Sequence, residues 1–157
     1  SDIWCKAWYL LAEGLDASLA RFAEMGLQGI CMAVSYHAGM LFLPHNPRQK
    51  VRFLEDGSLY FQPRGGHFRG LALQPRVSAL AAETDPLEDI CQAAARHGLQ
   101  VVAWTVCCHN SYQGERHPDL VLHNAFGVAI PCASCSSNPT ITWAFRMAII
   151  TKKSSCL

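Results

Sequence analysis

The chain has 157 residues, of which 50% are hydrophobic and 16% are charged, and its formal net charge at pH 7 is +1. The charge is nearly balanced and the chain has no long basic run. It therefore lacks the basic surface that proteins use to bind nucleic acid or an anionic membrane. The apolar runs, residues 29–34 among them, are far shorter than the roughly 20 residues that cross a bilayer. We therefore expect one domain with a sizeable core and with neither nucleic acid nor a membrane as a partner.

The first elements in chain order are a strand, a helix and a second strand. Residues 3–11 are apolar and aromatic, which predicts a first strand. A helical pattern follows, with Asp16 as a candidate N-terminal cap and Gly26 at the position where a helix end favours a left-handed residue. Residues 29–34 then form a continuous apolar run, which is typical of a parallel strand buried on both faces.

The same unit returns 72 residues further on. Residues 26–28, Gly-Leu-Gln, recur as residues 98–100, and nine residues after each glutamine stands a histidine, His37 and His109. Such internal similarity indicates a repeated structural unit.

The second copy also has a helix before its glycine and an apolar run after it. Pro86 suits the first turn of that helix, and Thr84 or Asp85 is its candidate cap. The apolar run, residues 101–106, predicts another strand buried on both faces. Helix, glycine and strand, repeated, predict an α/β protein with right-handed crossovers.

A long polar insertion, residues 43–76, separates the two copies. We expect one short hairpin in it, formed by residues 50–54 and 59–62 around the turn at Glu55-Asp56-Gly57. Insertions of this length are uncommon unless they are functional. Its aromatic and basic residues suit a sugar or an anionic ligand, but aromatics in such a loop more often pack beneath the loop itself.

Polar side chains directly follow the second and later strands. Tyr36, His37, His109 and Asn110 stand at the expected carboxyl ends, where α/β proteins place their ligand sites. A lone histidine there is more often structural. Two histidines at equivalent positions of a repeat favour a ligand-binding role and a structural role about equally.

A second group lies in the loop after the later strand. It contains the acids Glu115 and Asp119 together with His117 and Asn124. These residue types can hold a polyhydroxylated ligand or transfer a proton, although a solvated loop has the same composition.

Cysteine chemistry offers a weaker alternative. Pro131-Cys132-Ala-Ser-Cys135 matches half of the zinc deaminase signature, but the upstream glutamate is missing, so deamination is rejected. A structural zinc on Cys132, Cys135 and two of the histidines 109, 117 and 123 stays open, while no cofactor is expected. Several cysteines fall in apolar periodic segments, which indicates buried thiols and favours a cytoplasmic protein.

Several of these short motifs together resemble a known group of proteins, the amino-terminal half of uncharacterised TIM-barrel proteins related to glycoside hydrolases. The motifs are residues 36–47, 55–61, 97–104, 109–111, 117–119 and 124–127. The resemblance implies a partial (β/α) TIM-type barrel over residues 1–127, with about four parallel strands and the insertion at 43–76 after the second. Residues 128–157 depart from the pattern, and we expect an irregular tail there, which a shifted reading frame or a truncation would explain.

The resemblance also implies roles for the site residues. Carbohydrate-binding residues would be Tyr36, His37, Trp104, His109, Asn110, His117 and Asn124. Glu115 and Asp119 are the fallback candidates for catalytic acids within this chain. Glycoside hydrolysis usually needs two carboxyl groups about 5 to 9.5 Å apart, and at least one is expected from later strands. The leading hypothesis is therefore a glycoside-hydrolase-like fragment that binds a sugar-like ligand, and its activity alone stays open. The alternatives are a non-catalytic carbohydrate-binding or interaction module and a small zinc-binding domain. About four strands cannot close a barrel, so exposed sheet edges would also favour self-association.

Overall fold

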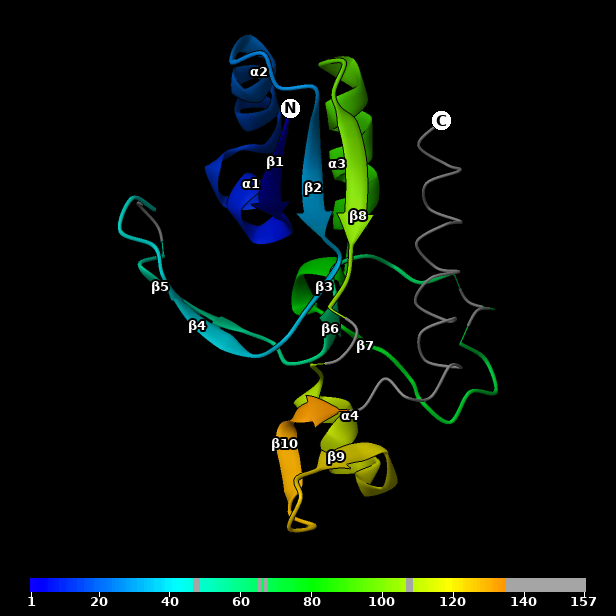
Figure 1. Ribbon diagram of the computed structural model, residues 1–157. Coiled ribbons are helices and arrows are strands. Elements are labelled where there is room, and N and C mark those ends of the chain that lie inside the picture. Colours follow the sequence, from blue (N-terminus) through cyan, green and yellow to red (C-terminus); the bar gives the residue numbers. More distant parts are fainter. Residues whose placement is uncertain (47–48, 65, 67, 107–108, 135–157) are drawn as a thin grey trace.

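A computed structural model describes residues 1–46, 49–64, 66, 68–106 and 109–134 of the chain (Figure 1). Its main sheet is parallel and has the strand order β1-β2-β8. The strands are β1 (Asp2–Lys6), β2 (Gly29–Ala33) and β8 (Gln100–Trp104). Figure 1 shows the three strands side by side with their carboxyl ends at the same edge.

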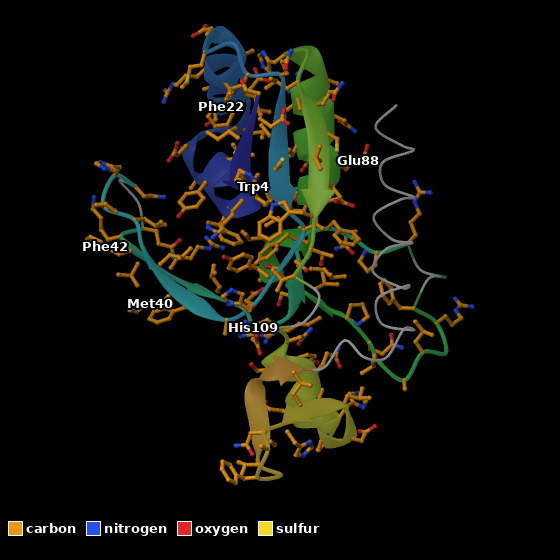
Figure 2. The ribbon with its side chains drawn as sticks, viewed as in Figure 1. Trp4, Phe22, Met40, Phe42, Glu88 and His109 are labelled. Atoms are coloured by element: carbon orange, nitrogen blue, oxygen red, sulfur yellow. The ribbon has the colours of Figure 1, made fainter. Side chains whose placement is uncertain are left out.

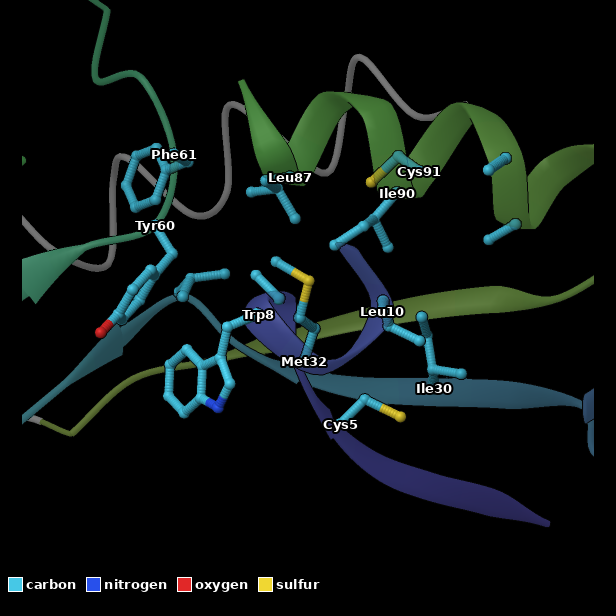
Figure 3. Close-up of a cluster of buried hydrophobic side chains, with 14 of the residues drawn as sticks. Cys5, Trp8, Leu10, Ile30, Met32, Tyr60, Phe61, Leu87, Ile90 and Cys91 are labelled. Atoms are coloured by element: carbon cyan, nitrogen blue, oxygen red, sulfur yellow. The ribbon is translucent and has the colours of Figure 1, made fainter. Parts of the chain in front are cut away.

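Three helices cover one face of this sheet, and Figure 1 shows them behind the strands. They are α1 (Ala7–Glu13), α2 (Leu15–Glu24) and α3 (Pro86–Arg96). Their apolar faces bury the sheet side chains that point toward them, including Ile30 and Met32 from β2 and Ile90 from α3 (Figure 3). The predicted order of helix and strand in both repeat copies is thereby confirmed.

The local signals at the helix ends behave largely as the sequence predicts. Asp85 caps α3, because its carboxylate accepts hydrogen bonds from the backbone of Leu87 and Glu88, and Pro86 occupies the first turn. Gly26 and Gly98 both have left-handed backbones, with φ of 78° and 68°. The predicted cap at Asp16 is wrong, since the cap of α2 is Gly14 and Asp16 lies in the first turn.

The first strand is shorter than expected. It ends at Lys6, and residues 7–13 form α1 instead of continuing the strand to residue 11. Ala7 and Leu10, three residues apart, are both buried together with Trp8, which is a helical spacing. The aromatic residues of this segment favour a strand in a sequence-based prediction, so the helical spacing is easily missed.

The insertion forms two small sheets, and its strands do not pair as predicted. β4 (Gly39–Phe42) pairs antiparallel with β5 (Val51–Leu54). β6 (Ser58–Leu59) lies between β3 (Ser35–Tyr36) and β7 (Arg76–Val77). The expected hairpin of residues 50–54 with 59–62 is therefore wrong. The two segments flank the turn at Gly57 (φ 59°), but β5 pairs with β4, and β6 pairs with β3 and β7.

The remaining elements follow the insertion and β8. They are the 3-10 turn η1 (Ala79–Ala81), α4 (Ser111–Arg116), the 3-10 turn η2 (Pro118–Leu120), β9 (Val121–His123) and β10 (Ala129–Ser134). β9 and β10 are antiparallel. Residues 129–134 thus form a strand where the sequence predicts irregular structure, and the rest of the expected tail lies outside the described residues.

The α/β class is confirmed, but barrel closure is not observed. The parallel sheet has three strands in the described part of the chain, where about four were predicted. The expected double burial of the second repeat strand is also wrong, because Val102 of β8 is 48% exposed. Within the described ranges, no helix is long and apolar enough to cross a membrane.

Candidate functional site

The face of the parallel sheet opposite the helices carries aromatic and basic side chains. Side chains alternate along a strand, so Cys5 of β1 points into the helix-covered core while Trp4 and Lys6 lie on the other face. The register places Lys6 beside Ala33 and Ala33 beside Trp104. Trp4 is 69% exposed, so this face is open to a ligand.

Five rings gather toward the carboxyl end of this face, and we call them the strand-end cluster: Trp4, Tyr36, His37, Trp104 and His109. Figure 2 labels two of them, Trp4 and His109. Trp4 and Trp104 meet edge to face, with centroids 5.1 Å apart. Tyr36 lies 6.0 Å from Trp104 and stacks on His37 at 4.4 Å. His37 in turn stacks on His109 at 4.3 Å. The rings form one continuous group across the strand ends.

The backbone after β2 and β8 holds these rings in place. The backbone N–H of Val34 donates to the carbonyl oxygen of Trp104 at 2.9 Å. The buried hydroxyl of Ser35 bonds to the hydroxyl of Thr105 and accepts from the N–H of Val106 at 3.2 Å. The two strand-end loops are thus joined directly beside the cluster.

Asp56 in the insertion ties the two histidine-bearing loops together. One carboxylate oxygen accepts from the N–H of Ala38 at 3.0 Å, and the other accepts from the N–H of Tyr112 at 2.6 Å. Ala38 follows His37, and Tyr112 stands three residues after His109. The turn at residues 55–57, which the sequence predicts as the turn of a hairpin, therefore joins the two loops that carry His37 and His109.

The imidazole of His37 is also fixed locally. Its Nδ1 lies 2.6 Å from the carbonyl oxygen of Ala38. A carbonyl oxygen only accepts hydrogen bonds, so Nδ1 must carry a proton. Nε2 is the ring atom left to meet a ligand.

Two cations lie over the aromatic rings at the side of the cluster. Lys6 Nζ donates to the Tyr36 hydroxyl at 3.2 Å and lies 4.3 Å from the centroid of that ring. The guanidinium carbon of Arg52 lies 5.8 Å from the ring centroid of Trp8. Arg52 is half-buried, whereas its neighbour Phe53 is exposed, because side chains of β5 alternate between the two faces of the hairpin.

Sequence reasoning named four of these residues and missed others. It predicted Tyr36, His37, Trp104 and His109, which the structure brings together. It did not assign a site role to Trp4, Lys6 or Asp56, and it considered Arg52 only as one of several basic residues of the insertion that would suit a sugar or an anionic ligand. Trp4 and Lys6 are two residues apart, and the alternation of a strand would have placed them on one face.

Asn110 and Asn124 have local structural bonds. The side-chain oxygen of Asn110 accepts from the N–H of Gln113 at 3.0 Å and caps α4. That of Asn124 accepts from Phe126 and Val128 in the turn before β10. Both amide oxygens are engaged in holding loops.

The two predicted acids lie apart from these ring contacts. Glu115 is on α4 and Asp119 is in η2, and both are exposed. Within the described residues, no hydrogen bond or ion pair joins either acid, or His117, to the strand-end cluster. Their catalytic role stays a prediction.

Burial favours the neutral form of two nearby groups. Burial, with a smaller contribution from Cys31, raises the pKa of the Cys5 thiol to about 11. Burial, followed by the nearby Glu55 carboxylate, raises the pKa of Tyr60 to about 12. Neither group supplies an anion to the site.

The zinc alternative gains no support from the described residues. They contain no group of three or more histidine, cysteine, aspartate or glutamate side chains that could hold a metal ion. Cys135 and the side chain of Cys132 lie outside what the structure describes.

Comparisons with known proteins show a fold but no family. The sequence matches no protein family model, and no curated protein is similar to it. The structure is similar to the crystal structure of a hypothetical protein from Ruminiclostridium thermocellum ATCC 27405, with a TM-score of 0.64 and 8% sequence identity. The match covers 98% of this chain and 70% of the other. At this identity, the likeness concerns the fold alone.

Proposed function

We propose that the chain binds a carbohydrate-like ligand on the strand-end cluster, as part of a glycoside-hydrolase-like (β/α) protein. The observation that carries the proposal is the group of five rings at the carboxyl ends of parallel strands, with Trp4 largely exposed. Parallel α/β sheets bind ligands at this end. A sugar ring presents an apolar face of C–H groups that packs on an aromatic ring.

Polar groups around the rings supply the hydrogen bonds that a sugar needs. The Tyr36 hydroxyl, the Lys6 ammonium and Nε2 of His37 border the aromatic surface. Ligand sites commonly combine an aromatic lining with a few such polar groups that fix orientation. This arrangement supports recognition of a polyhydroxylated ligand more directly than it supports catalysis.

Binding without hydrolysis is the function that the geometry favours for this chain. Hydrolysis would need a pair of carboxyl groups flanking the scissile bond. The carboxylate next to the cluster, Asp56, is engaged by two backbone N–H groups. Glu115 and Asp119 remain the candidates if the chain has hydrolytic activity.

The test is a panel of oligosaccharides titrated against the protein, followed by tryptophan fluorescence and calorimetry. Trp4→Ala should weaken binding about tenfold, since loss of an aromatic contact of about 1.4 kcal/mol changes affinity by that factor. Phe126→Ala is the matched control, because Phe126 is 90% exposed in the turn before β10. Equal losses in both variants, or no binding by the unaltered chain, would refute the proposal.

Hydrolysis is tested separately with the same panel. Turnover that Glu115→Gln or Asp119→Asn abolishes would assign the acids a catalytic role. Binding without turnover is the result that we expect.

A further inference from the structure

Hydrogen-bond donors without acceptors concentrate beside the strand-end cluster. In the described part of the chain, the buried side-chain polar atoms that lack a partner are Nε1 of Trp8, Nε of Arg52 and Nε1 of Trp104. All three are N–H donors. Trp8 and Trp104 lie 5.9 and 6.0 Å from Tyr36, measured between ring centroids, and Arg52 lies over Trp8.

Two positively charged side chains lie near the same ring, that of Trp8. Lys6 Nζ lies 5.4 Å from the Trp8 centroid, on whose ring Arg52 also rests at 5.8 Å. Among the described residues, neither cation has a carboxylate within salt-bridge distance. Their bonds are to neutral groups, the Tyr36 hydroxyl and the side-chain oxygen of Gln49.

The nearby carboxylates are occupied elsewhere. Both oxygens of Glu55 accept from the backbone N–H of Ala79, and Asp56 accepts from Ala38 and Tyr112. Aromatic faces attract the cations without neutralising them. Among the described residues, the surroundings of Trp8 therefore hold two cations without a carboxylate partner and two N–H donors, Trp8 Nε1 and Arg52 Nε, without an acceptor.

We propose that the ligand bound at the strand-end cluster is an acidic carbohydrate, whose carboxylate, phosphate or sulfate group is bound by Lys6 and Arg52. This inference rests on the proposed function, which it narrows to one ligand class. An anion would form charge-assisted hydrogen bonds with the ammonium and guanidinium groups, and these are stronger than bonds between neutral groups. The covered tryptophan N–H groups add positive potential without needing to touch the ligand. Half-burial of both cations limits screening by salt and water.

The experiment uses a glycan array of matched pairs, in which each acidic glycan stands beside its neutral parent. Uronates, sugar phosphates and sugar sulfates form separate arms that identify the acid group. We expect an acidic glycan to bind at least about tenfold more tightly than its neutral parent, and this ratio to fall as ionic strength rises. Equal affinity for acidic and neutral members would overturn the inference while leaving the proposed function standing.

Substitutions then locate the anion-binding groups. Lys6→Met and Arg52→Gln should each reduce the acidic-to-neutral ratio, and the double variant should bring it near one. Lys50→Met removes an exposed charge from the same hairpin, where Lys50 bonds to the Pro44 carbonyl oxygen, and should leave the ratio unchanged. A preference retained in the double variant would overturn the assignment to these residues.

Two further measurements keep the outcomes distinct. The unfolding midpoint of each variant checks folding, and the ionic-strength dependence of the unaltered chain tests the inference even where a variant is unstable. Failure of every glycan to bind would refute the proposed function and this inference together.

Discussion

The imidazole rings of His37 and His109 lie 4.3 Å apart and within 9° of parallel, although they belong to different copies of the repeat. Their strands β2 and β8 are neighbours in the parallel sheet, so equivalent positions of the repeat arrive side by side. The Asp56 carboxylate accepts from the backbone N–H of Ala38, next to His37, and from that of Tyr112, three residues after His109. The stack thus depends on a residue from the insertion between the copies.

Removing this carboxylate should separate the two loops. Asp56→Ala loses two hydrogen bonds to a charged group, each worth about 1.5–3 kcal/mol of unfolding free energy. We expect a loss of about 2–5 kcal/mol by chemical denaturation, accompanied by loss of the mutual ring-current shifts of His37 and His109 in NMR spectra. Asp119→Ala, at an exposed acid, is the control. An unchanged stack in Asp56→Ala would contradict this role.

Gly57 allows the insertion to approach the cap of α4. Its φ is 59°, and a Cβ there would clash with the side-chain oxygen of Asn110. Gly57→Ala should therefore destabilise the protein by about 2–4 kcal/mol in urea denaturation, through backbone strain and the clash. Gly70→Ala tests strain alone, because Gly70 has φ of 78° and nothing within 4 Å of a Cβ. Equal losses at both sites would show that the contact with Asn110 is unimportant.

Asp85 is the cap that starts the second repeat helix. Its carboxylate accepts from Leu87 and Glu88, and its second oxygen accepts from the N–H of Gln62 in the insertion. Asp85→Ala should lower the free energy of unfolding by about 1–2 kcal/mol. Thermal unfolding measures this, with the exposed Glu83→Ala as control. A midpoint no lower than that of the control would argue against a capping contribution.

Asp16 should make stability depend on pH. Hydrogen bonds from Arg96 and then His97 hold the pKa of Asp16 below its ordinary value of 3.8. Because the folded state favours the charged carboxylate, this stabilisation is present above pH 3.8 and disappears as pH falls through the lower folded-state pKa. Denaturation curves of the unaltered chain and Asp16→Asn should therefore differ at neutral pH and converge in acid. A difference that does not change with pH would contradict the linkage.

Exposed apolar strands lead us to propose that copies of the chain associate at high concentration. Met40, Phe42, Val51 and Phe53 form cross-strand pairs on the outer face of the β4–β5 hairpin, and all four are exposed (Figure 2 labels Met40 and Phe42). Sedimentation should show concentration-dependent association that Phe53→Lys reduces. Leu122→Lys, at an exposed position of β9, should have little effect. A monodisperse monomer at all concentrations would exclude the association.

The sequence by itself determined the repeated helix-and-strand unit and most of its helix ends. Gly26 and Gly98 adopt left-handed backbones, and Asp85 with Pro86 begins α3, because these preferences depend on a few neighbouring atoms. The same local repeat also placed His37 and His109 at equivalent positions after two strands. Their proximity then required that the two strands pair and that Asp56 join the two loops.

Tertiary structure alone decided which distant segments meet. Val51–Leu54 pairs with β4 rather than with residues 59–62, and Asp56 bonds to Ala38 and Tyr112, because strand pairing and loop closure depend on the packing of the whole chain. The open face with Trp4 and the placement of Lys6 and Arg52 around Trp8 arise in the same way. The spacing of residues in the sequence does not predict these contacts. Each contact joins residues whose local preferences would allow several different partners.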